Sequence, residues 1–173
     1  WKRRCAATTS ARSVPAGDRG TATIAAVDID GDGDLDLAES GPAGVRIYRN
    51  GGRAFADVTA QLLGDTAAGP ATAVLAGDHD NDGRADLAVL RPAGIALLHA
   101  APAGGFTDVT AAAELAPPVE NPRSAAWLDA DHDGDLDLFV AGGSDAAPAT
   151  RLFRNNGTGR FTNVAAESGR KVA

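Results

Sequence analysis

The sequence predicts an all-β chain built from three tandem, four-stranded antiparallel blades of the β-propeller type, each about 50 residues long. Three observations lead to this prediction. An acidic stretch recurs in register, beginning at Asp28, Asp78 and Asp129 with spacings of 50 and 51 residues. Each copy is flanked by short apolar runs, separated by Gly, Asn, Asp and Pro, that are typical of strands. No segment keeps a 3.6-residue apolar period between helix caps.

Each repeat provides four expected strands in the same order. They lie at residues 21–27, 35–40, 44–50 and 54–59 in the first copy, at 71–77, 85–90, 94–100 and 105–110 in the second, and at 123–128, 136–141, 150–156 and 160–165 in the third. The sequences DVTAQLLG and DVTAAAELA, where two of the fourth strands end, are expected to form at most a short helical turn. The domain division is therefore an N-terminal segment, 1–18, followed by repeats 19–68, 69–119 and 120–173.

Charge is distributed unevenly along the 173 residues, whose formal net charge is −7. Of the 23 acidic residues, 14 fall in the windows 28–36, 78–86 and 129–137. The 16 Lys and Arg residues are scattered apart from an opening WKRR, so a nucleic-acid partner is not expected. No apolar run reaches the length of a membrane helix. The single cysteine, Cys5, allows no intrachain disulfide, which leaves an incidental thiol or an interchain bridge.

The acidic stretches share the pattern D-x-D-x-D-G-x-x-D, which we number as positions 1 to 9. Two carboxylates about 5 Å apart repel by roughly 3 kcal/mol at a dielectric constant near 20, so such a cluster needs either full solvation or a cation. Alternate residues of a tight loop converge on one centre, and the glycine at position 6 permits the turn that aims the position-7 carbonyl inward. A set of oxygen ligands in a flexible loop is typical of Ca²⁺.

The pattern therefore predicts three Ca²⁺ sites, in which the position-7 residue contributes only its backbone oxygen, as an arginine there suggests. The candidate ligands are Asp28, Asp30, Asp32, Asp34 and Asp36 in the first loop, Asp78, Asp80, Asp82, Arg84 and Asp86 in the second, and Asp129, Asp131, Asp133, Asp135 and Asp137 in the third.

Other interpretations of these loops are less well supported. An EF-hand would need Glu at position 12, which Glu39 provides, whereas the other copies have Val89 and Val140 and β-like flanks. Mg²⁺ demands a small octahedral site and keeps its waters. For Zn²⁺ the usual ligands are missing, because His79 and His132 occupy different loop positions, 2 and 4, that are expected to point outward at the surface. The remaining interpretation is a solvated acidic loop without a metal, which three copies in register, each with glycine at position 6, make less plausible.

A second signature accompanies the loops. Tyr48-Arg49-Asn50 leads to the FADVT sequence of residues 55–59, and residues 153–156 lead to FTNV at 161–164; the middle copy keeps FTDVT at 106–110. With these motifs the chain resembles, over roughly residues 19–168, the FG-GAP and VCBS-type repeats of integrin α-subunit propellers and secreted bacterial proteins. It is especially similar to ASPIC-type extracellular repeat proteins.

This resemblance implies calcium in the hairpin loop between the first two strands of each blade, and a secreted or cell-surface protein. It also implies a ring of about seven blades, within the usual range for propellers. Three blades would then be completed by the rest of a longer protein or by other copies of the chain, or would stack as an open array. Since no cap is recognisable in the C-terminal sequence, we expect an edge there to be offered to a partner.

The expected function is a non-catalytic extracellular calcium-binding module for adhesion or structural assembly. No G-x-S-x-G, H-E-x-x-H or phosphate-binding glycine motif occurs, and the acidic pairs, though similar to glycosidase carboxylates, recur too regularly for one active site. Alternatives are a filament subunit joined through its end blades and a fragment of a secreted carbohydrate-active or other enzyme. A protein or glycan ligand would first be sought at the longer loop 142–150. Asn156-Gly157-Thr158 is either a glycosylation sequon or a plain turn.

Overall fold

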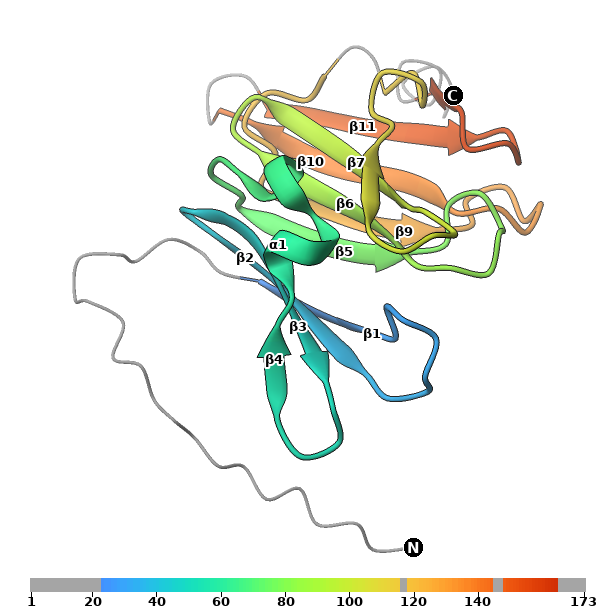
Figure 1. Ribbon diagram of the computed structural model, residues 1–173. Coiled ribbons are helices and arrows are strands. Elements are labelled where there is room, and N and C mark those ends of the chain that lie inside the picture. Colours follow the sequence, from blue (N-terminus) through green and yellow to red (C-terminus); the bar gives the residue numbers. More distant parts are fainter. Residues whose placement is uncertain (1–22, 116–117, 145–147, 165–173) are drawn as a thin grey trace, which may run out of the picture.

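The computed structural model describes residues 23–115, 118–144 and 148–164, which form three separate four-stranded antiparallel sheets and confirm the all-β prediction (Figure 1). We call them blades 1, 2 and 3. Blade 1 consists of β1 (Ile24–Val27), β2 (Asp36–Gly41), β3 (Gly44–Asn50) and β4 (Phe55–Asp57). Blade 2 consists of β5 (Ala73–Gly77), β6 (Asp86–Arg91), β7 (Gly94–Ala100) and β8 (Phe106–Asp108). Blade 3 consists of β9 (Ser124–Leu128), β10 (Asp137–Gly143), β11 (Pro148–Asn155) and β12 (Phe161–Asn163).

Within each blade the strands follow one another as an up-and-down meander, so every strand pairs with its neighbours in sequence. In blades 1 and 2 the second and third strands are joined by a two-residue Pro-Ala turn at residues 42–43 and 92–93. The corresponding connection in blade 3 is longer and includes residues 145–147, which lie outside the described residues. The expected helical turn after the fourth strand is present in blade 1 as α1 (Thr59–Leu62), followed by a 3₁₀ turn, η1 (Gly64–Ala67).

The DVT sequence fastens the fourth strand to the third. Asp57 accepts a hydrogen bond from the Thr59 amide (3.0 Å), while the Thr59 hydroxyl oxygen accepts one from the Ile47 amide in β3 (2.9 Å). Blade 2 repeats the arrangement, with the Thr110 hydroxyl accepting from the Leu97 amide at 2.9 Å. Backbone groups that the short fourth strand leaves unpaired are satisfied in this way.

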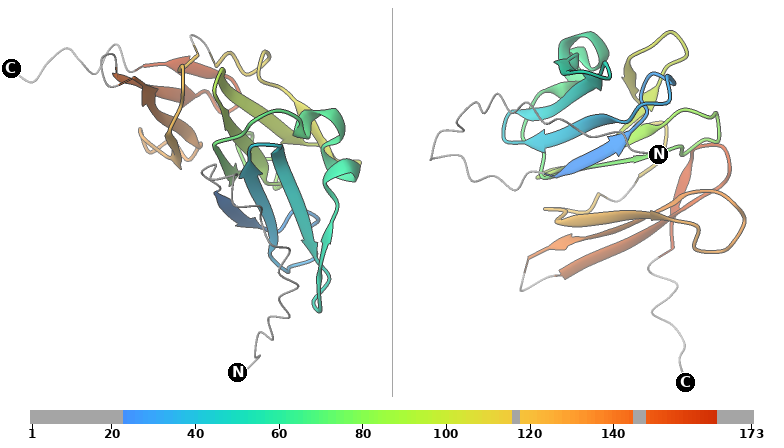
Figure 2. Two further views of the ribbon diagram at one scale, coloured as in Figure 1. Left: turned by 90° about the vertical axis from the view of Figure 1, so that its left-hand side faces the viewer. Right: turned by 90° about the horizontal axis from the view of Figure 1, so that it is seen from below.

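The three sheets stack face against face, and their first strands lie next to one another, β1 beside β5 and β5 beside β9 (Figure 2). One buried apolar cluster fills the space between blades 1 and 2 and includes Ile47, Val74 and Leu87. A second cluster fills the space between blades 2 and 3 and includes Leu138 and Phe153. Burial of these clusters is the main favourable term holding the blades together.

The middle blade is covered on both faces. Residues 86–90 of β6 are all buried, which explains why its sequence DLAVL has nearly continuous apolar residues instead of alternating apolar and polar ones. Strand β2 alternates between buried and half-buried residues, and Phe139 of β10 remains 40% exposed between buried neighbours. Blades 1 and 3 therefore each bury one face against blade 2 and present the other outward.

Some predictions fall on parts of the chain that the structure does not describe. These are the N-terminal segment 1–18 with Cys5, and the C-terminal edge beyond residue 164. Asn156 lies in an exposed turn, where its side-chain oxygen accepts hydrogen bonds from the amide and hydroxyl of Thr158. Among the helices of the described segments, none has the length and apolar character needed to cross a bilayer.

Candidate metal centres

Each acidic stretch forms the loop between the first and second strands of its blade. Loop 1 joins β1 to β2, loop 2 joins β5 to β6, and loop 3 joins β9 to β10. The three loops lie at the same end of their sheets. Loops 2 and 3 are in contact, because the side-chain Nδ2 of Asn81 donates a hydrogen bond to the Asp135 carboxylate at 2.6 Å. The architecture thus places three equivalent acidic turns along one edge of the stack.

The position-1 aspartate organises each loop by accepting hydrogen bonds from its backbone. Asp28 accepts from the amides of Gly31, Asp32 and Gly33 at 2.8, 3.1 and 2.9 Å. Asp78 and Asp129 accept from the amides of positions 5 and 6 in the same way, at 2.8–3.2 Å. At position 5, each aspartate accepts from the amide of position 7, at 2.9–3.0 Å. The loop backbone is consequently curled around its own carboxylates.

Two positions in each loop adopt a left-handed backbone. At position 6, Gly33, Gly83 and Gly134 have φ of 88°, 84° and 96°, and a Cβ at any of them would meet nothing within 4 Å. Glycine is therefore required for the backbone conformation and not for space. Position 4, which sequence analysis did not single out, is also left-handed and is occupied by Gly31, Asn81 and His132, residue types that tolerate this region. This explains the exposed His132, whose predicted surface location is correct.

The carboxylates at positions 1, 3 and 5 converge. In every loop one oxygen from each of the three lies within 4.8 Å of the others. The three groups are Asp28, Asp30 and Asp32; Asp78, Asp80 and Asp82; and Asp129, Asp131 and Asp133. Each pair of charges at this separation repels by about 3 kcal/mol at an effective dielectric constant of 20. An oxygen-only donor set with this charge fits Ca²⁺, and none of the three triads includes the His or Cys ligand that zinc sites commonly use.

The position-9 aspartates have a structural role that the sequence did not reveal. Asp36, Asp86 and Asp137 are 1%, 0% and 0% exposed. One carboxylate oxygen accepts from the amide of loop position 2, at 2.9–3.1 Å. The other accepts from a backbone amide at the end of the third strand, at 2.7–2.8 Å. Each of these side chains therefore ties its loop to the sheet, and its inclusion in a ligand set stays a prediction.

The side chains at position 7 of loops 2 and 3 contact groups other than a metal ion. Arg84 pairs with the position-5 carboxylate of Asp82 and donates to the Ala100 carbonyl at 2.9 Å. Asp135 accepts the bond from Asn81. These contacts leave the predicted role of position 7, a ligand through its backbone oxygen, as a prediction for Asp34, Arg84 and Asp135.

A nitrogen-bearing side chain from the third strand lies next to each position-3 aspartate. Arg49 lies 2.9 Å from Asp30, and Arg154 lies 3.1 Å from Asp131. In blade 2 the equivalent residue is His99, whose Nδ1 lies 3.3 Å from Asp80. The arginine of the YRN and FRN sequences was visible as a signature, but only the structure shows that it offsets part of the loop charge.

His79 is not a surface residue, and its predicted outward orientation is wrong. Its side chain is 3% exposed because the hairpin of blade 3 covers it: a Cβ on Gly159 would lie 3.1 Å from Nε2. The ring hydrogen-bonds through Nδ1 to Asp86 and stacks on Phe161 with a centroid distance of 6.2 Å. A long-range contact between blades thus overrides the local alternation of the loop.

The charges around His79 and Asp86 shift both of their pKa values. Burial alone would lower the pKa of His79, but the hydrogen bond and charge of Asp86, with smaller contributions from Asp80 and Asp78, raise it. Burial alone would raise the pKa of Asp86, but hydrogen bonds from the His79 ring and from the amides of Ala100 and His79 lower it. Burial is the largest single effect on each pKa, but hydrogen bonds and opposite charge together outweigh it, so the pKa of His79 is raised and that of Asp86 is lowered.

No curated protein sequence matches the chain. Among solved structures it is similar to a lectin from Agrocybe aegerita that recognises non-reducing terminal N-acetylglucosamine, with a TM-score of 0.51 and 22% identity. The similarity covers 83% of this chain but only 37% of the lectin chain, and at this identity it supports the β fold alone.

The sequence profile of the FG-GAP-like repeat matches residues 28–89 and again 78–140. Repeats of this kind are typical of extracellular proteins. The two matches overlap and together span all three acidic loops, the strands between them and the segments that link successive blades. On this basis the chain belongs to the FG-GAP-like repeat family.

Proposed function

We propose that the chain is a non-catalytic, extracellular β-repeat module that binds three Ca²⁺ ions, one in each loop, and serves adhesion or structural assembly. The observation that carries the proposal is the convergence of the carboxylates at positions 1, 3 and 5 in all three loops. One triad could be a chance surface cluster, but the same triad in three loops with the same backbone hydrogen bonds is a repeated design. Hard dications favour such oxygen donors.

Calcium would act here as part of the structure. Each loop connects the first two strands of a blade, so an ion held by its carboxylates would replace their mutual repulsion with attraction and fix the hairpin. Extracellular modules bind calcium with Kd on the order of 10⁻⁴ to 10⁻³ M, which suits the millimolar calcium outside cells. Binding to the folded state alone would stabilise the protein by mass action.

The test is the number of ions bound. Isothermal titration of the metal-free chain with Ca²⁺ is expected to give three ions per chain. Single replacement of a position-5 aspartate (Asp32→Asn, Asp82→Asn or Asp133→Asn) is expected to remove one ion each. Asp65→Asn is the matched control, since it removes the same charge from an exposed site in η1, outside the loops. A chain that binds no calcium, or position-5 variants that bind as many ions as the control, would contradict the proposal.

A second candidate, assembly through the end blades, is favoured by the positions of the exposed apolar side chains. Strand register places Ile24 and Phe55, 64% and 51% exposed, on the outer face of blade 1, and Leu128 and Phe139, 38% and 40% exposed, on that of blade 3. Repeat proteins bury such faces against a neighbouring repeat. A further blade or another copy of the chain would cover these residues.

Sedimentation velocity can test this second candidate. Self-association that increases with protein concentration is expected for the unmodified chain and should weaken in Phe139→Glu and Phe55→Glu. Gln61→Glu adds the same charge on the exposed surface of α1 and should leave association unchanged. A chain that remains monomeric at all concentrations would contradict assembly from copies of this chain.

A further inference from the structure

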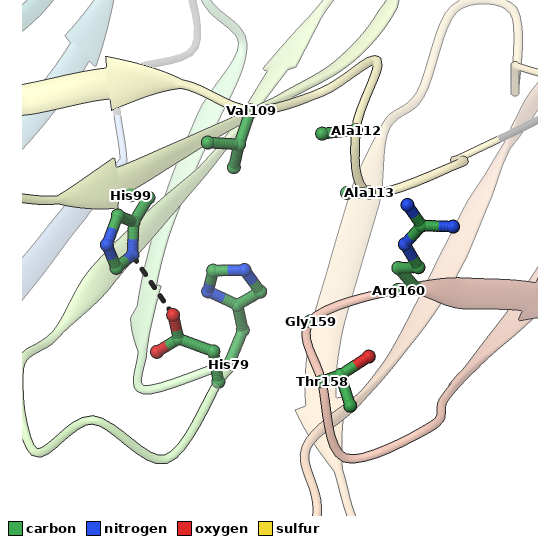
Figure 3. Close-up of a pocket in the computed structure, with 9 residues that line it drawn as sticks. His79, His99, Val109, Ala112, Ala113, Thr158, Gly159 and Arg160 are labelled. Carbon is green, nitrogen blue, oxygen red and sulfur yellow. Dashed lines mark ion pairs between the residues drawn. The ribbon is translucent and has the colours of Figure 1, made fainter.

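A pocket lies between blades 2 and 3, next to loop 2. It has a volume of about 210 Å³ and is lined on one side by His79, Asp80 and His99 of blade 2 (Figure 3). Residues 158–160 of the last hairpin of blade 3 form the opposite wall, and Val109 with the following turn closes the remainder. Both histidine rings face this space (Figure 3).

Two imidazoles and two carboxylates lie together here: His79, Asp80 and His99 line the pocket, and the buried Asp86 lies behind them. His79, Asp80, Asp86 and His99 each place one potential ligand atom within 4.8 Å of the others. His99 Nδ1 lies 3.1 Å from an oxygen of Asp86 and 3.3 Å from one of Asp80; the second contact is the dashed line in Figure 3. A ring nitrogen carries at most one N–H, so His99 Nδ1 can donate to only one of these two oxygens at a time.

One oxygen of the cluster lacks a partner. Asp80 Oδ1 is buried, and no group among the described residues hydrogen-bonds to it. A buried carboxylate oxygen without a donor is costly, and a bound cation would satisfy it. This observation is independent of the spacing of the four side chains and points to a missing cation beside Asp80, the residue that this cluster shares with the carboxylate triad of loop 2.

The cluster is held in position by the surrounding fold. Asp86 is fully buried and accepts backbone amides from loop 2 and from β7, at 3.1 and 2.8 Å. The His79 carbonyl accepts a hydrogen bond from the Asn155 side chain of blade 3 at 2.6 Å, and the His79 ring stacks on Phe161. Ligands fixed in this way lose little conformational entropy when a metal binds.

Blade 2 alone among the three carries this arrangement. The residues that replace His79 in loops 1 and 3 are Ile29 and Ala130, and those that replace His99 are Arg49 and Arg154. A guanidinium pairs with the position-3 aspartate but is not a metal ligand, whereas a neutral imidazole is one. Both histidines are therefore departures from the repeat, and both fall at the same site.

We propose that His79, His99, Asp80 and Asp86 form a fourth metal site that takes a transition-metal dication of the zinc class. Two nitrogen and two oxygen donors suit zinc, whereas calcium and magnesium prefer oxygen donors alone. This site goes beyond the calcium sites, although Asp80 also belongs to the carboxylate triad of loop 2 and Asp86 to the ligand set predicted for that loop.

The site is tested by titrating the full chain with Zn²⁺ while calcium is kept saturating. All proteins carry Cys5→Ser so that the only thiol cannot contribute. The expected result is one zinc ion per chain, with Co²⁺ in its place giving visible absorption bands that zinc abolishes. In His99→Arg the zinc affinity should fall by at least about tenfold, since loss of a ligand should cost no less than loss of a group that orients one.

Three variants distinguish loss of a zinc ligand from unfolding and from unspecific zinc binding. His99→Arg should fold normally, because arginine occupies this place in blades 1 and 3 and pairs there with the position-3 aspartate; its thermal unfolding provides the check. His132→Asn, which removes the remaining histidine, should bind zinc like the parent protein. Arg49→His introduces one imidazole into blade 1 without a second and should create no new site.

Three results would overturn the proposal: a parent protein that binds no zinc, a folded His99→Arg variant with the parent's zinc affinity, or a loss of binding in His132→Asn. Zinc that only displaced calcium from the loops would bind equally to His99→Arg, so that outcome falls among these three. A parent protein that binds zinc but no calcium would contradict the calcium proposal and not the zinc proposal.

Discussion

The position-9 aspartates allow the structural and metal-binding roles of a loop to be separated. Asp36 is 1% exposed and accepts hydrogen bonds from the amides of Ile29 (3.0 Å) and Asn50 (2.7 Å). In Asp36→Asn the side chain keeps one acceptor oxygen and turns an NH₂ group toward the other amide. One of the two hydrogen bonds is lost, and a buried N–H is left without an acceptor.

The size of the effect follows from these contacts. A buried N–H without a partner costs about 1–3 kcal/mol, and weakening the remaining bond from charged to neutral costs about another 1 kcal/mol. Removing one charge from the acidic loop reduces the repulsion among its carboxylates and so stabilises the folded state by roughly 1 kcal/mol. We therefore expect Asp36→Asn to lower the free energy of unfolding by about 2 kcal/mol in chelator.

The assay is urea denaturation in chelator and in calcium, with Asp32→Asn as the partner variant. Asp32 is exposed, and an asparagine can still accept from the Asp34 amide, so its effect in chelator should stay within about 0.5 kcal/mol. In calcium at ten times Kd, Asp32→Asn should lose about 1.4 kcal/mol of binding stabilisation. If Asp36→Asn unfolds like the parent protein in chelator, the reasoning about position 9 is wrong.

Three further predictions concern the frame that holds the loops. Thr59→Val keeps the shape but removes the acceptor of the Ile47 amide, and should lower the free energy of unfolding by about 1 kcal/mol, measured by urea denaturation. Hydrogen bonds from the Thr59 side chain and amide lower the pKa of Asp57, so its contribution is present above the unfolded pKa near 3.9 and is lost as pH falls through the folded value. The stability gap between the parent and Asp57→Asn should accordingly narrow on acidification, and a constant gap would contradict this. Gly44→Ala would place Cβ 1.8 Å from the Ala67 carbonyl oxygen at φ +123° and should lower the melting temperature strongly; an unchanged melting temperature would refute the tight contact.

Much of the fold could be predicted because the information is local and repeated. Runs such as GVRIYRN and GIALLHA recur at the same offset from each acidic stretch, and the structure has strands at 44–50 and 94–100. The loop glycines were also predictable, since a left-handed turn restricts the choice of residue at position 6. Because the same pattern occurs in all three repeats, an assignment that is ambiguous in one copy is supported by the other two.

The remaining features depend on contacts between blades, which no local pattern encodes. Its loop position predicts that His79 lies at the surface, but the hairpin that contains Gly159, about eighty residues later in the sequence, covers it. His99 lies in strand β7, and only the folded structure brings it next to His79 of loop 2. The departures of blade 2 from its two sister repeats were the one available signal.

Burial of β6 on both sides has a consequence for motion. Its backbone amides are shielded by whole sheets in front and behind, whereas those of β1 and β12 are near the ends of the stack. Hydrogen exchange should proceed inward from the two outer layers, and the second layer should open only when the others have already separated from it. The protein would thus have its slowest-opening segment in the layer that also carries both histidines of the zinc-type cluster.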